Sequence, residues 1–593
     1  MSKELYKNIP SRLGDLLRDV RSGRIGLPDL QRPFVWQDNK VRNLFDSMIK
    51  GYPVGYIMLW ESPVEYEDKK SSIGFGEKIF VEPKELVIDG QQRLTALVSA
   101  MYGIKIKDKN FKERNIKISY NPLNKEFAVW TPAFENNPEW IPEISNVFLA
   151  KADDTVSKLR RGYIKKLNVS REKGELPKLT EVEEDGIEKS VHALLSLEEY
   201  QLPTLEISYN ASEEDVADIF VRVNSGGQSL NENNFILTLI SVYEKDMRDS
   251  IDAFCEQSRI PADKTAYNTI MAVEPSNLVR MAVGVGFRRA RLRYVYMLLR
   301  GKDLATGEVT VETRQENLDK FRAALTMVMN LNNWHAFLNI IADGGYLSNK
   351  LIASSNAIVY SYVLYLTAKY DYNMESVKLK KLISRWFYMS AITVYYSGST
   401  ESTVEKQFAD LRDIHTAEEF EEYINKSISA RFTDDYFSIS LPLELNSSSA
   451  ISPAWYGYLA AQNILNIPML FSTNMLAKYL VPGSSGTKNA VDKHHIFPKN
   501  YLTGIGFIND RDRNQMANFT YLDYTTNIDI ADKNPSDYVG DFRTILGEEE
   551  YLKSCKQHAL PENFESMEYM DFLEKRRYLM AGIVKAAYKK LCI

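Results

Sequence analysis

The stretch Val491-Asp-Lys-His-His-Ile-Phe-Pro-Lys-Asn500 (VDKHHIFPKN) places two adjacent histidines between a short extended segment and a proline. The chain of 593 residues contains six histidines, so a pair at one place is an unusual local concentration. Two asparagines follow, Asn518 at 23 positions after His495 (518 − 495) and Asn527 at 9 positions after that (527 − 518). This ordered series of imidazole and amide side chains is the first candidate site in the chain.

A His, then an Asn, then a His or Asn at about this spacing is typical of a strand–strand–helix nuclease site. Phosphodiester hydrolysis needs a base that activates water and a cation that neutralises the phosphate. Histidine suits the first role because its pKa is near neutrality, and we assign the base to His495. An imidazole and a side-chain oxygen can hold one divalent ion, so His494 and Asn527 are the expected metal ligands. Asn518 is expected to orient His495 through a hydrogen bond, and Lys533 to contact a phosphate.

The histidine pair also makes a geometric demand. Neighbouring residues of a strand point to opposite faces, so His494 and His495 need a strand end or a bend to face one cleft, and Pro498 fits that demand. An isolated pair is more often a surface or core feature than a site, but the ordered series with the asparagines and Lys533 outweighs that reading. Asp492 is either a further ligand or a solvated residue at the strand start, and we favour the second.

A second motif is Asp89-Gly90-Gln91-Gln92-Arg93, between a predicted strand and a predicted helix that ends near Met101. A tight turn into a helix start leaves backbone N–H groups pointing outward, which favours an anion. The Gln and Arg side chains add donors suited to a phosphate or a base edge. Asp-Gly is also simply a good turn, and the residues alone leave the two readings evenly balanced. No GxxxxGK[ST] motif occurs, which excludes nucleotide chemistry of the P-loop kind.

Length and composition bound the class of protein. A chain of 593 residues predicts two to four domains. Its 44% hydrophobic and 26% charged residues, with a net charge of −6, indicate a globular protein without a uniformly basic coat, although local basic grooves remain allowed. Three scattered cysteines without a CxxC exclude a zinc knuckle and fit a reducing interior. No apolar signal core or membrane-spanning tract is present, so a cytoplasmic location is expected.

Hydrophobic periodicity predicts a mixed N-terminal region followed by helices. Helices are expected at 11–21, 38–49 and 158–173, and strands at 56–60, 85–88, 115–120, 126–130 and 205–209. The helix at 158–173 is rich in Lys and Arg and is either solvated, which we favour, or faces DNA. The stretch 243–442 is almost wholly helical in pattern. We expect an N-terminal domain at 1–242, a helical middle domain at 243–445 and a third domain at 446–593, the last boundary marked by a Ser-rich loop.

Two further segments have two readings each. The stretch Phe287–Lys302 gathers arginines with interleaved tyrosines. It suits contact with a nucleic-acid backbone, but arginines on a solvated helix that pair with nearby acids are equally expected. The loop Asn224-Ser-Gly-Gly227 is a helix stop or a backbone that closely approaches a ligand's phosphates.

Together these motifs resemble the GmrSD-type modification-dependent (type IV) restriction endonucleases. LPDLQRPFVW, VIDGQQRLTAL and FVRVNSGGQSL are similar to the ParB-like N-terminal nucleotide-binding domain of that family. HHIFPKNYL, the Ala-Asn pair at 517–518, the second Asn and DKNPSDY are similar to its C-terminal His-Me finger (HNH) nuclease domain. The resemblance covers nearly the full length and is weakest over the helical middle.

The resemblance implies roles for individual residues. A nucleoside triphosphate would be bound and hydrolysed at the second motif and its flanking segments: Arg32, Asp89, Gly90, Gln91, Gln92, Arg93, Asn224, Gly226 and Gly227. The nuclease site would consist of His494, His495, Asn518 and Asn527. The family cuts modified DNA, typically of phages, inside bacteria. Asn527 stands at the third nuclease position instead of His, which leaves the choice of Mg²⁺ or a similar divalent cation open.

The sequence thus predicts an α+β multidomain endodeoxyribonuclease with a ParB-like domain, a helical middle and a ββα-metal nuclease domain. Its expected partner is double-stranded DNA, and a homodimer is a mild expectation because a duplex break by a one-metal site needs two active sites or two visits. The alternatives are a nucleotide-gated DNA-binding sensor with only nicking or residual nuclease activity, and an RNA-directed toxin with the same nuclease fold.

Overall fold

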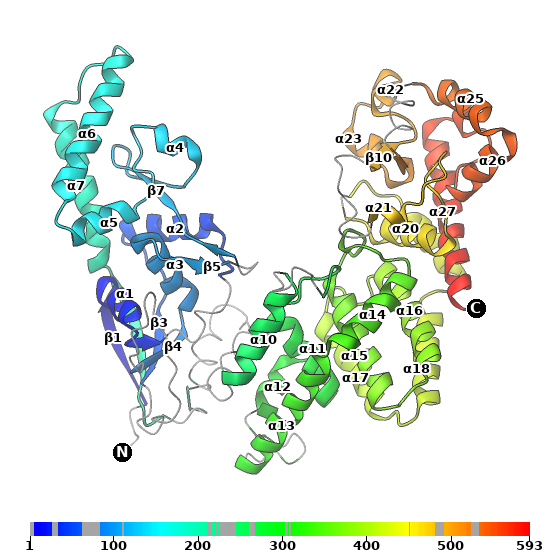
Figure 1. The fold of residues 1–593 in the computed structure, drawn as a ribbon, viewed down its shortest axis with the longest axis horizontal. Helices are drawn as coiled ribbons and strands as arrows, with labels where there is room; N and C mark the ends of the chain where they lie inside the picture. The colour runs from blue at the N-terminus through cyan, green and yellow to red at the C-terminus, as the bar shows by residue number, and fades with distance from the viewer. Residues whose placement is uncertain are drawn as a thin grey trace. The chain divides into compact units, whose positions relative to one another are not determined.

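The computed structural model describes residues 5–26, 34–61, 84–108, 112–211, 215–216, 219, 223, 237, 245–259, 267–299, 301–302, 306, 310–449, 451–480, 491–523, 530 and 533–593. The chain forms two compact units, Met1–Ile260 and Pro261–Ile593, which are described one at a time (Figure 1). The histidine pair and residues 261–445 of the predicted helical middle lie in the second unit, whereas residues 243–260 belong to the first. The three-domain division stays a prediction. Within the described residues, no helix combines the length and apolar character that a bilayer crossing requires.

The first unit is mixed in its secondary structure. Its elements in chain order are β1 Tyr6–Arg12, α1 Leu13–Ser22, β2 Ile25–Gly26, α2 Asp38–Ile49, β3 Ile57–Glu61, β4 Glu85–Asp89, α3 Gln91–Tyr102, β5 Ile106–Lys107, β6 Glu113–Arg114, β7 Ile118–Asn121, β8 Glu126–Val129, α4 Pro132–Asn136, α5 Ser145–Ala152, α6 Val156–Lys173, α7 Glu181–Leu195, the 3-10 turn η2 Ser196–Glu199, β9 Gln201–Ile207 and α10 Lys245–Gln257. One sheet has the strand order β1-β9-β3-β4-β2. In it β9 runs parallel to β3, and β3 runs antiparallel to β4.

Apolar spacing decides how the helices of this unit pack. In α1 the residues Leu13, Leu16, Leu17 and Val20 share one face and are buried, as the periodicity predicts. Helix α3 buries more of its circumference, and its Leu94, Leu97 and Met101 belong to the same core as α1. Helix α6, in contrast, buries only Tyr163 and Leu167 among its described side chains. It is largely exposed, as both the solvated and the DNA-facing reading of this segment require.

Strand β9 and strand β1 correct the sequence-based assignments. The strand predicted at 205–209 begins earlier, at Gln201, because Leu202, Thr204 and Ile207 turn their side chains into the unit. Strand β1 carries no alternating apolar pattern and is exposed along most of its length. It forms because its backbone pairs with β9 from Tyr6 to Arg12, a long-range contact that local periodicity does not encode.

The second unit is largely helical, with one short hairpin. Its elements are α11 Pro275–Phe287, α12 Leu292–Leu299, α13 Val311–Val328, α14 Leu331–Asp343, η3 Asn349–Leu351, α15 Ser355–Tyr370, α16 Ser376–Ile392, α17 Thr400–Arg412, α18 Ala417–Ser429, the π-turn η4 Tyr436–Ser440, α19 Leu441–Glu444, α20 Pro453–Leu465, α21 Ala477–Leu480, β10 Val491–His495, α22 Lys499–Gly504, α23 Asp510–Arg513, η5 Met516–Asn518, β11 Phe519–Asp523, α25 Pro535–Leu546, α26 Glu548–Gln557, η6 Phe564–Ser566 and α27 Tyr569–Leu591. Helix α27 packs against α20 (Figure 1). It also contacts η5, the turn that leads into β11. Through this contact α27 supports the turn that leads into the hairpin strand β11.

The arginine cluster that begins at Phe287 is engaged in ion pairs. Arg288 caps α11 in the left-handed conformation, donates to the Thr367 hydroxyl at 2.9 Å and pairs with Asp371. Arg289 pairs with Glu405 at 2.9 Å. Of the two readings of this cluster, the structure therefore favours pairing with acids over an open surface for a nucleic-acid backbone.

Candidate functional site

The histidine pair lies at the end of the only hairpin in the described part of the second unit. Strand β10 pairs antiparallel with β11 from Val491 opposite Asp523 to His495 opposite Phe519. His495 is therefore the last residue of its strand, which confirms the prediction of a strand end. The pairing stays regular to this point, so alternation places His494 and His495 on opposite faces of the hairpin.

The imidazole of His495 is held by a hydrogen bond and by an aromatic ring. Its Nε2 lies 2.9 Å from Oδ1 of Asn514, and its ring centroid lies 4.5 Å from that of Phe519. With the Asn514 oxygen as acceptor, Nε2 carries the proton, and Nδ1 is then the basic nitrogen. Asn514 thus fixes both the tautomer and the orientation of the ring.

The surroundings of His495 favour an uncharged imidazole and place positive side chains near it. Burial lowers the pKa of His495, and the nearby cations Lys493, Lys499 and Arg513 lower it further, while the bond from Asn514 acts in the opposite direction. A neutral imidazole near pH 7 can accept a proton, as a general base must. The same cations attract a negatively charged ligand.

Asn518 differs from its predicted role. Its side chain is fully buried, and its Oδ1 accepts from the backbone N–H of Phe497 at 2.8 Å. Its Nδ2 donates to the carbonyl of Phe497 at 3.0 Å and to that of Arg513 at 3.2 Å. Both amide protons are used in these bonds, so none remains for His495. The orienting hydrogen bond predicted from Asn518 is made by Asn514 instead, and Asn518 joins the segments on either side of the site.

Arg576 of α27 supports this arrangement from the interior. Its side chain is fully buried, and its guanidinium donates to the carbonyls of Ala517 at 2.7 Å, Phe519 at 2.8 Å and His558 at 3.2 Å. The first two carbonyls flank Asn518 in the chain. Burial lowers the pKa of Arg576. The arginine is bound to main-chain oxygens, and it fixes the turn from which Asn518 reaches the end of β10.

The opposite face of the hairpin is tied to a buried histidine. Thr520 lies opposite His494 in the pairing, and its hydroxyl is 3.4 Å from Nδ1 of His558. The same Nδ1 is 3.2 Å from the Gln462 amide, and Nε2 of His558 is 2.8 Å from the carbonyl of Pro468. Burial lowers the pKa of His558 to about 4. The His494 side chain thus lies on the face of the hairpin that contains this uncharged, interior network.

The predicted metal ligands are only partly described. Among the described residues no three His, Cys, Asp or Glu side chains gather in a way that could hold a metal ion. Asn527, the predicted partner of His494, lies outside the described residues. Lys533 is described, and its ammonium pairs with Asp541 at 3.3 Å. Its predicted contact with a phosphate stays a prediction.

The motif at 89–93 forms the predicted strand, turn and helix. Gly90 has a φ of 94° and caps α3, and a Cβ there would lie 2.4 Å from Cδ1 of Ile57, so the turn requires glycine. Gln91 donates to the carbonyl of Val87 at 2.9 Å, and Gln92 accepts from the N–H of Val35 at 3.0 Å. These side chains join the turn to neighbouring backbone.

Arg93 is bound in the same manner. Its Nη1 donates to the carbonyl of Tyr56 at 2.6 Å, and burial lowers its pKa while Asp89 opposes that shift. A Cβ at Gly55 would come within 2.7 Å of Nη2 of Arg93, so the guanidinium lies against a backbone that only glycine leaves free. The donors expected for a phosphate thus make bonds within the fold, and nucleotide binding stays a prediction. The remaining predicted ligands, Arg32, Asn224, Gly226 and Gly227, lie outside the described residues.

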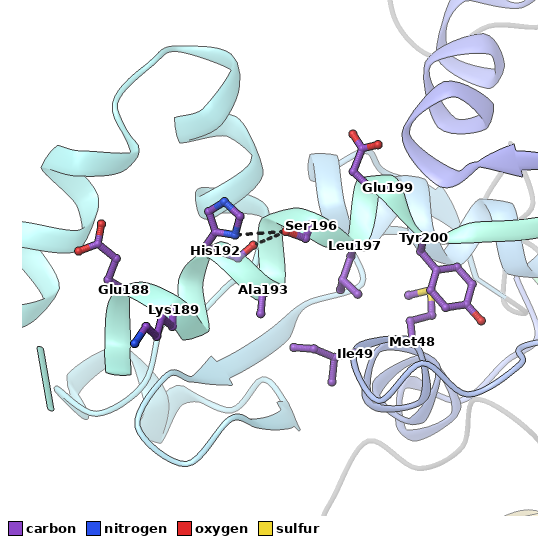
Figure 2. Close-up of a pocket in the computed structure, with 10 residues that line it drawn as sticks. All are labelled: Met48, Ile49, Glu188, Lys189, His192, Ala193, Ser196, Leu197, Glu199 and Tyr200. Atoms are coloured by element: carbon purple, nitrogen blue, oxygen red, sulfur yellow. Dashed lines mark hydrogen bonds between the residues drawn. The ribbon is translucent and has the colours of Figure 1, made fainter. Parts of the chain in front are cut away.

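A groove of about 630 Å³ lies elsewhere in the first unit, where the end of α2 meets α7 and η2 (Figure 2). Met48, Leu197 and Tyr200 give it an apolar floor, and the Ser196 hydroxyl donates to the carbonyl of His192 at 2.9 Å on its rim. None of the predicted site residues lines it. The groove therefore does not extend either candidate site.

Sequence reasoning missed Asn514, Lys493 and Arg576. Asn514 lies four positions before Asn518, and residue types give no means of choosing between two asparagines. Lys493 precedes the histidine pair, and the alternation of β10 places it on the same face as His495, a relation that was readable once β10 was assigned. Arg576 is 81 positions from His495 (576 − 495), and only the packing of α27 brings it to the site.

Comparison with known proteins supports the N-terminal half of the resemblance. Residues 13–241 match the family described as GmrSD restriction endonuclease, N-terminal domain. An uncharacterized protein of Methanocaldococcus jannaschii is 23% identical, over 94% of this chain and 92% of its own length. The family match includes the turn at 89–93 and ends well before the histidine pair. The chain is thus similar to the N-terminal domain of GmrSD restriction endonucleases over residues 13–241.

Proposed function

We propose that the protein is a metal-dependent DNA endonuclease that cleaves modified, foreign DNA in bacterial defence. Its first unit would contain the ParB-like nucleotide-binding and sensing domain, and the β10–β11 hairpin would belong to a ββα-metal (HNH) nuclease domain. The geometry of His495 supports this proposal most directly. A neutral imidazole with an assigned basic nitrogen lies at a strand end among three cations.

In the proposed reaction His495 acts as the general base. Its Nδ1 takes the proton of the attacking water, and Asn514 stabilises the imidazolium that forms because its oxygen accepts from Nε2. Asn518 and Arg576 hold the two segments that carry these groups in place. A divalent cation such as Mg²⁺, with His494 and Asn527 as its ligands, would neutralise charge on the phosphate. Since alternation places His494 on the other face of β10, its imidazole would have to reach this cation around the end of the strand.

The nucleotide requirement is a separate part of the proposal. The family match covers the segment that would bind a nucleoside triphosphate, and the turn at Gly90 begins helix α3, whose N-cap makes no side-chain hydrogen bond. We propose that nucleotide binding at this turn regulates cleavage in the cytoplasm, with a dimer providing the second cut of a duplex. A DNA-binding sensor with only nicking activity is the competing function.

Cleavage assays test the proposal directly. Purified full-length protein is incubated with modified and unmodified phage DNA and with supercoiled plasmid, each with and without nucleoside triphosphate and Mg²⁺. We expect linear products from modified DNA, and a rate about 10²–10⁴-fold lower for His495→Ala. His335→Ala, an exposed histidine of α14, is the matched control and should cleave like the wild type.

The outcomes separate the competing functions. Full-rate cleavage by His495→Ala would exclude the assigned base. Nicked plasmid without linear product, at a rate that nucleotide changes, would favour the sensor. Faster cleavage of RNA than of any DNA would indicate that the substrate is RNA and not DNA.

A further inference from the structure

We propose that Lys493, Phe519 and His495 form a phosphate-binding subsite for the nucleic-acid backbone, with the Lys493 ammonium as its cation. This subsite, called the Lys493 face below, rests on the proposed nuclease function and names the residue that would hold the substrate beside the base. Substitution of Lys493 alone therefore tests the proposal.

Strand geometry brings the three side chains together. Lys493 and His495 are two positions apart on β10, so they share one face and their backbones are about 7 Å apart. Phe519 lies directly opposite His495 on β11. The Lys493 ammonium lies 3.7 Å from the centroid of the Phe519 ring, and the His495 ring lies 4.5 Å from the same centroid. The Phe519 ring is therefore in contact with both the Lys493 ammonium and the His495 imidazole.

Among the described side chains around His495, the charge on Lys493 is the least neutralised. Lys499 and Arg513 both pair with Asp510, each at 2.7 Å. No carboxylate among the described side chains pairs with Lys493, which is exposed and rests against Phe519 and, at 5.9 Å, against Trp455. A ring contact is an attraction that leaves ammonium N–H donors available for an anion. Lys493 is thus held in place without being neutralised.

The neighbouring groups favour a phosphodiester over other anions. An anion bound at Lys493 lies on the same face as the basic imidazole, at a separation that one stretch of nucleic-acid backbone can bridge. The additional cations Lys499 and Arg513 extend the positive field along a polyanion. A backbone contact of this kind is independent of base sequence.

Binding measurements without metal test the Lys493 face apart from catalysis. Affinity of the full-length protein for a fluorescent DNA duplex is measured in EDTA over a series of salt concentrations. For Lys493→Met we expect binding roughly 3- to 10-fold weaker at low salt, and a plot of log affinity against log salt that is less steep by about one unit. Lys493→Arg should keep the wild-type slope, because a guanidinium also binds both a ring and a phosphate.

A matched lysine controls for the change in net charge. Lys553 of α26 is exposed and pairs with Glu550 at 3.1 Å. Lys553→Met should leave affinity and slope unchanged. An equal loss in Lys553→Met, an unchanged slope in Lys493→Met, or no duplex binding by the wild type at low salt would each overturn the subsite.

Two further arms identify the ligand and separate the two proposals. Inorganic phosphate should compete no better than sulfate at equal ionic strength. If millimolar phosphate displaces the duplex from the wild type but not from Lys493→Met, the ligand is a free phosphate group. Full-rate cleavage by His495→Ala would exclude His495 as the base, and no cleavage of any substrate by the wild type would remove the nuclease function; neither outcome affects the binding result. A normal slope in Lys493→Met with an inactive His495→Ala would remove only the subsite.

Discussion

The turn at Gln91–Arg93 and the end of the β10–β11 hairpin carry similar polar motifs but use them differently. In the turn, the side chains of Gln91, Gln92 and Arg93 bond to the main chain of neighbouring segments. At the hairpin, His495 is hydrogen-bonded to the described residues through Nε2 and lies near cations. Polar residues in a motif can therefore stabilise a fold or serve a ligand, and hydrogen-bond partners distinguish the two.

The largest expected effect concerns the support beneath the hairpin. Arg576→Met leaves the carbonyls of Ala517, Phe519 and His558 without their donor, which at about 1 kcal/mol for each costs roughly 3 kcal/mol. Hydrogen exchange followed by mass spectrometry should show faster opening of peptides from 491–523 and unchanged peptides from 85–102. Arg577→Met, whose guanidinium bonds to Asn446 at the surface, is the control with an expected change below about 0.5 kcal/mol.

Acidification should affect the two units in opposite directions. His558 is buried and neutral, with its pKa lowered from 6.5 to about 4, so below pH 6.5 the unfolded chain binds a proton that the folded chain does not. Stability is therefore lost as the pH falls from 6.5 towards 4, by about 2 kcal/mol at pH 5. Unit-specific hydrogen exchange at pH 7.5 and 5.0, corrected for intrinsic rates, measures this loss. His558→Gln should remove it.

In the first unit the titrating group is a carboxyl. Burial and a hydrogen bond with Glu61 raise the pKa of Glu206 from 4.5 to about 7. The folded carboxyl then holds a proton between these values and the unfolded one does not, so the stability it contributes at pH 5 is lost as the pH rises through 7. The first unit should gain stability on acidification, and Glu206→Gln should flatten that dependence. Loss of stability in both units at pH 5 would contradict the assignment.

A smaller effect tests which asparagine serves the base. Asn514→Ala should lower the cleavage rate about tenfold, equivalent to about 1.4 kcal/mol, because His495 loses the partner that fixes its tautomer. Its unfolding free energy should stay within about 0.5 kcal/mol of the wild type. Asn518→Ala should instead destabilise the hairpin, because Phe497 and Arg513 lose their bonds. Slower cleavage at unchanged stability in Asn518→Ala, together with lost stability in Asn514→Ala, would instead assign the orienting role to Asn518.

The smallest effect is expected in the turn. Gln91→Leu removes the donor to the Val87 carbonyl and should destabilise β4 by about 1 kcal/mol. Binding of fluorescent ATP and GTP analogues should not change if this side chain only supports the fold. Gln37→Leu, an exposed glutamine at the start of α2, is the control. If Gln91→Leu lost nucleotide binding at unchanged stability, Gln91 would be a ligand. Polar side chains would then serve a ligand in the turn as we propose for the hairpin.

The sequence by itself predicted many of the regular elements and proposed His495 as the base. Apolar spacing located α1, α2 and the solvated α6, and Asp-Gly after an apolar run located the β4–α3 turn, because these signals depend on residues close in the chain. The histidine pair and its strand end were also local signals. The family resemblance of the N-terminal half was carried by short motifs and is supported over residues 13–241.

Only the tertiary structure decided how the polar side chains are used. The pairing of β1 with β9, the bond from Asn514 to His495, and the contact of Arg576 with the turn at Asn518 all join segments distant in sequence. Residue types allow many such pairings, and packing selects one of them by burying apolar surface and satisfying main-chain groups. For that reason the sequence named His495 as the base, whereas the fold assigned its partner and placed Lys493 beside it.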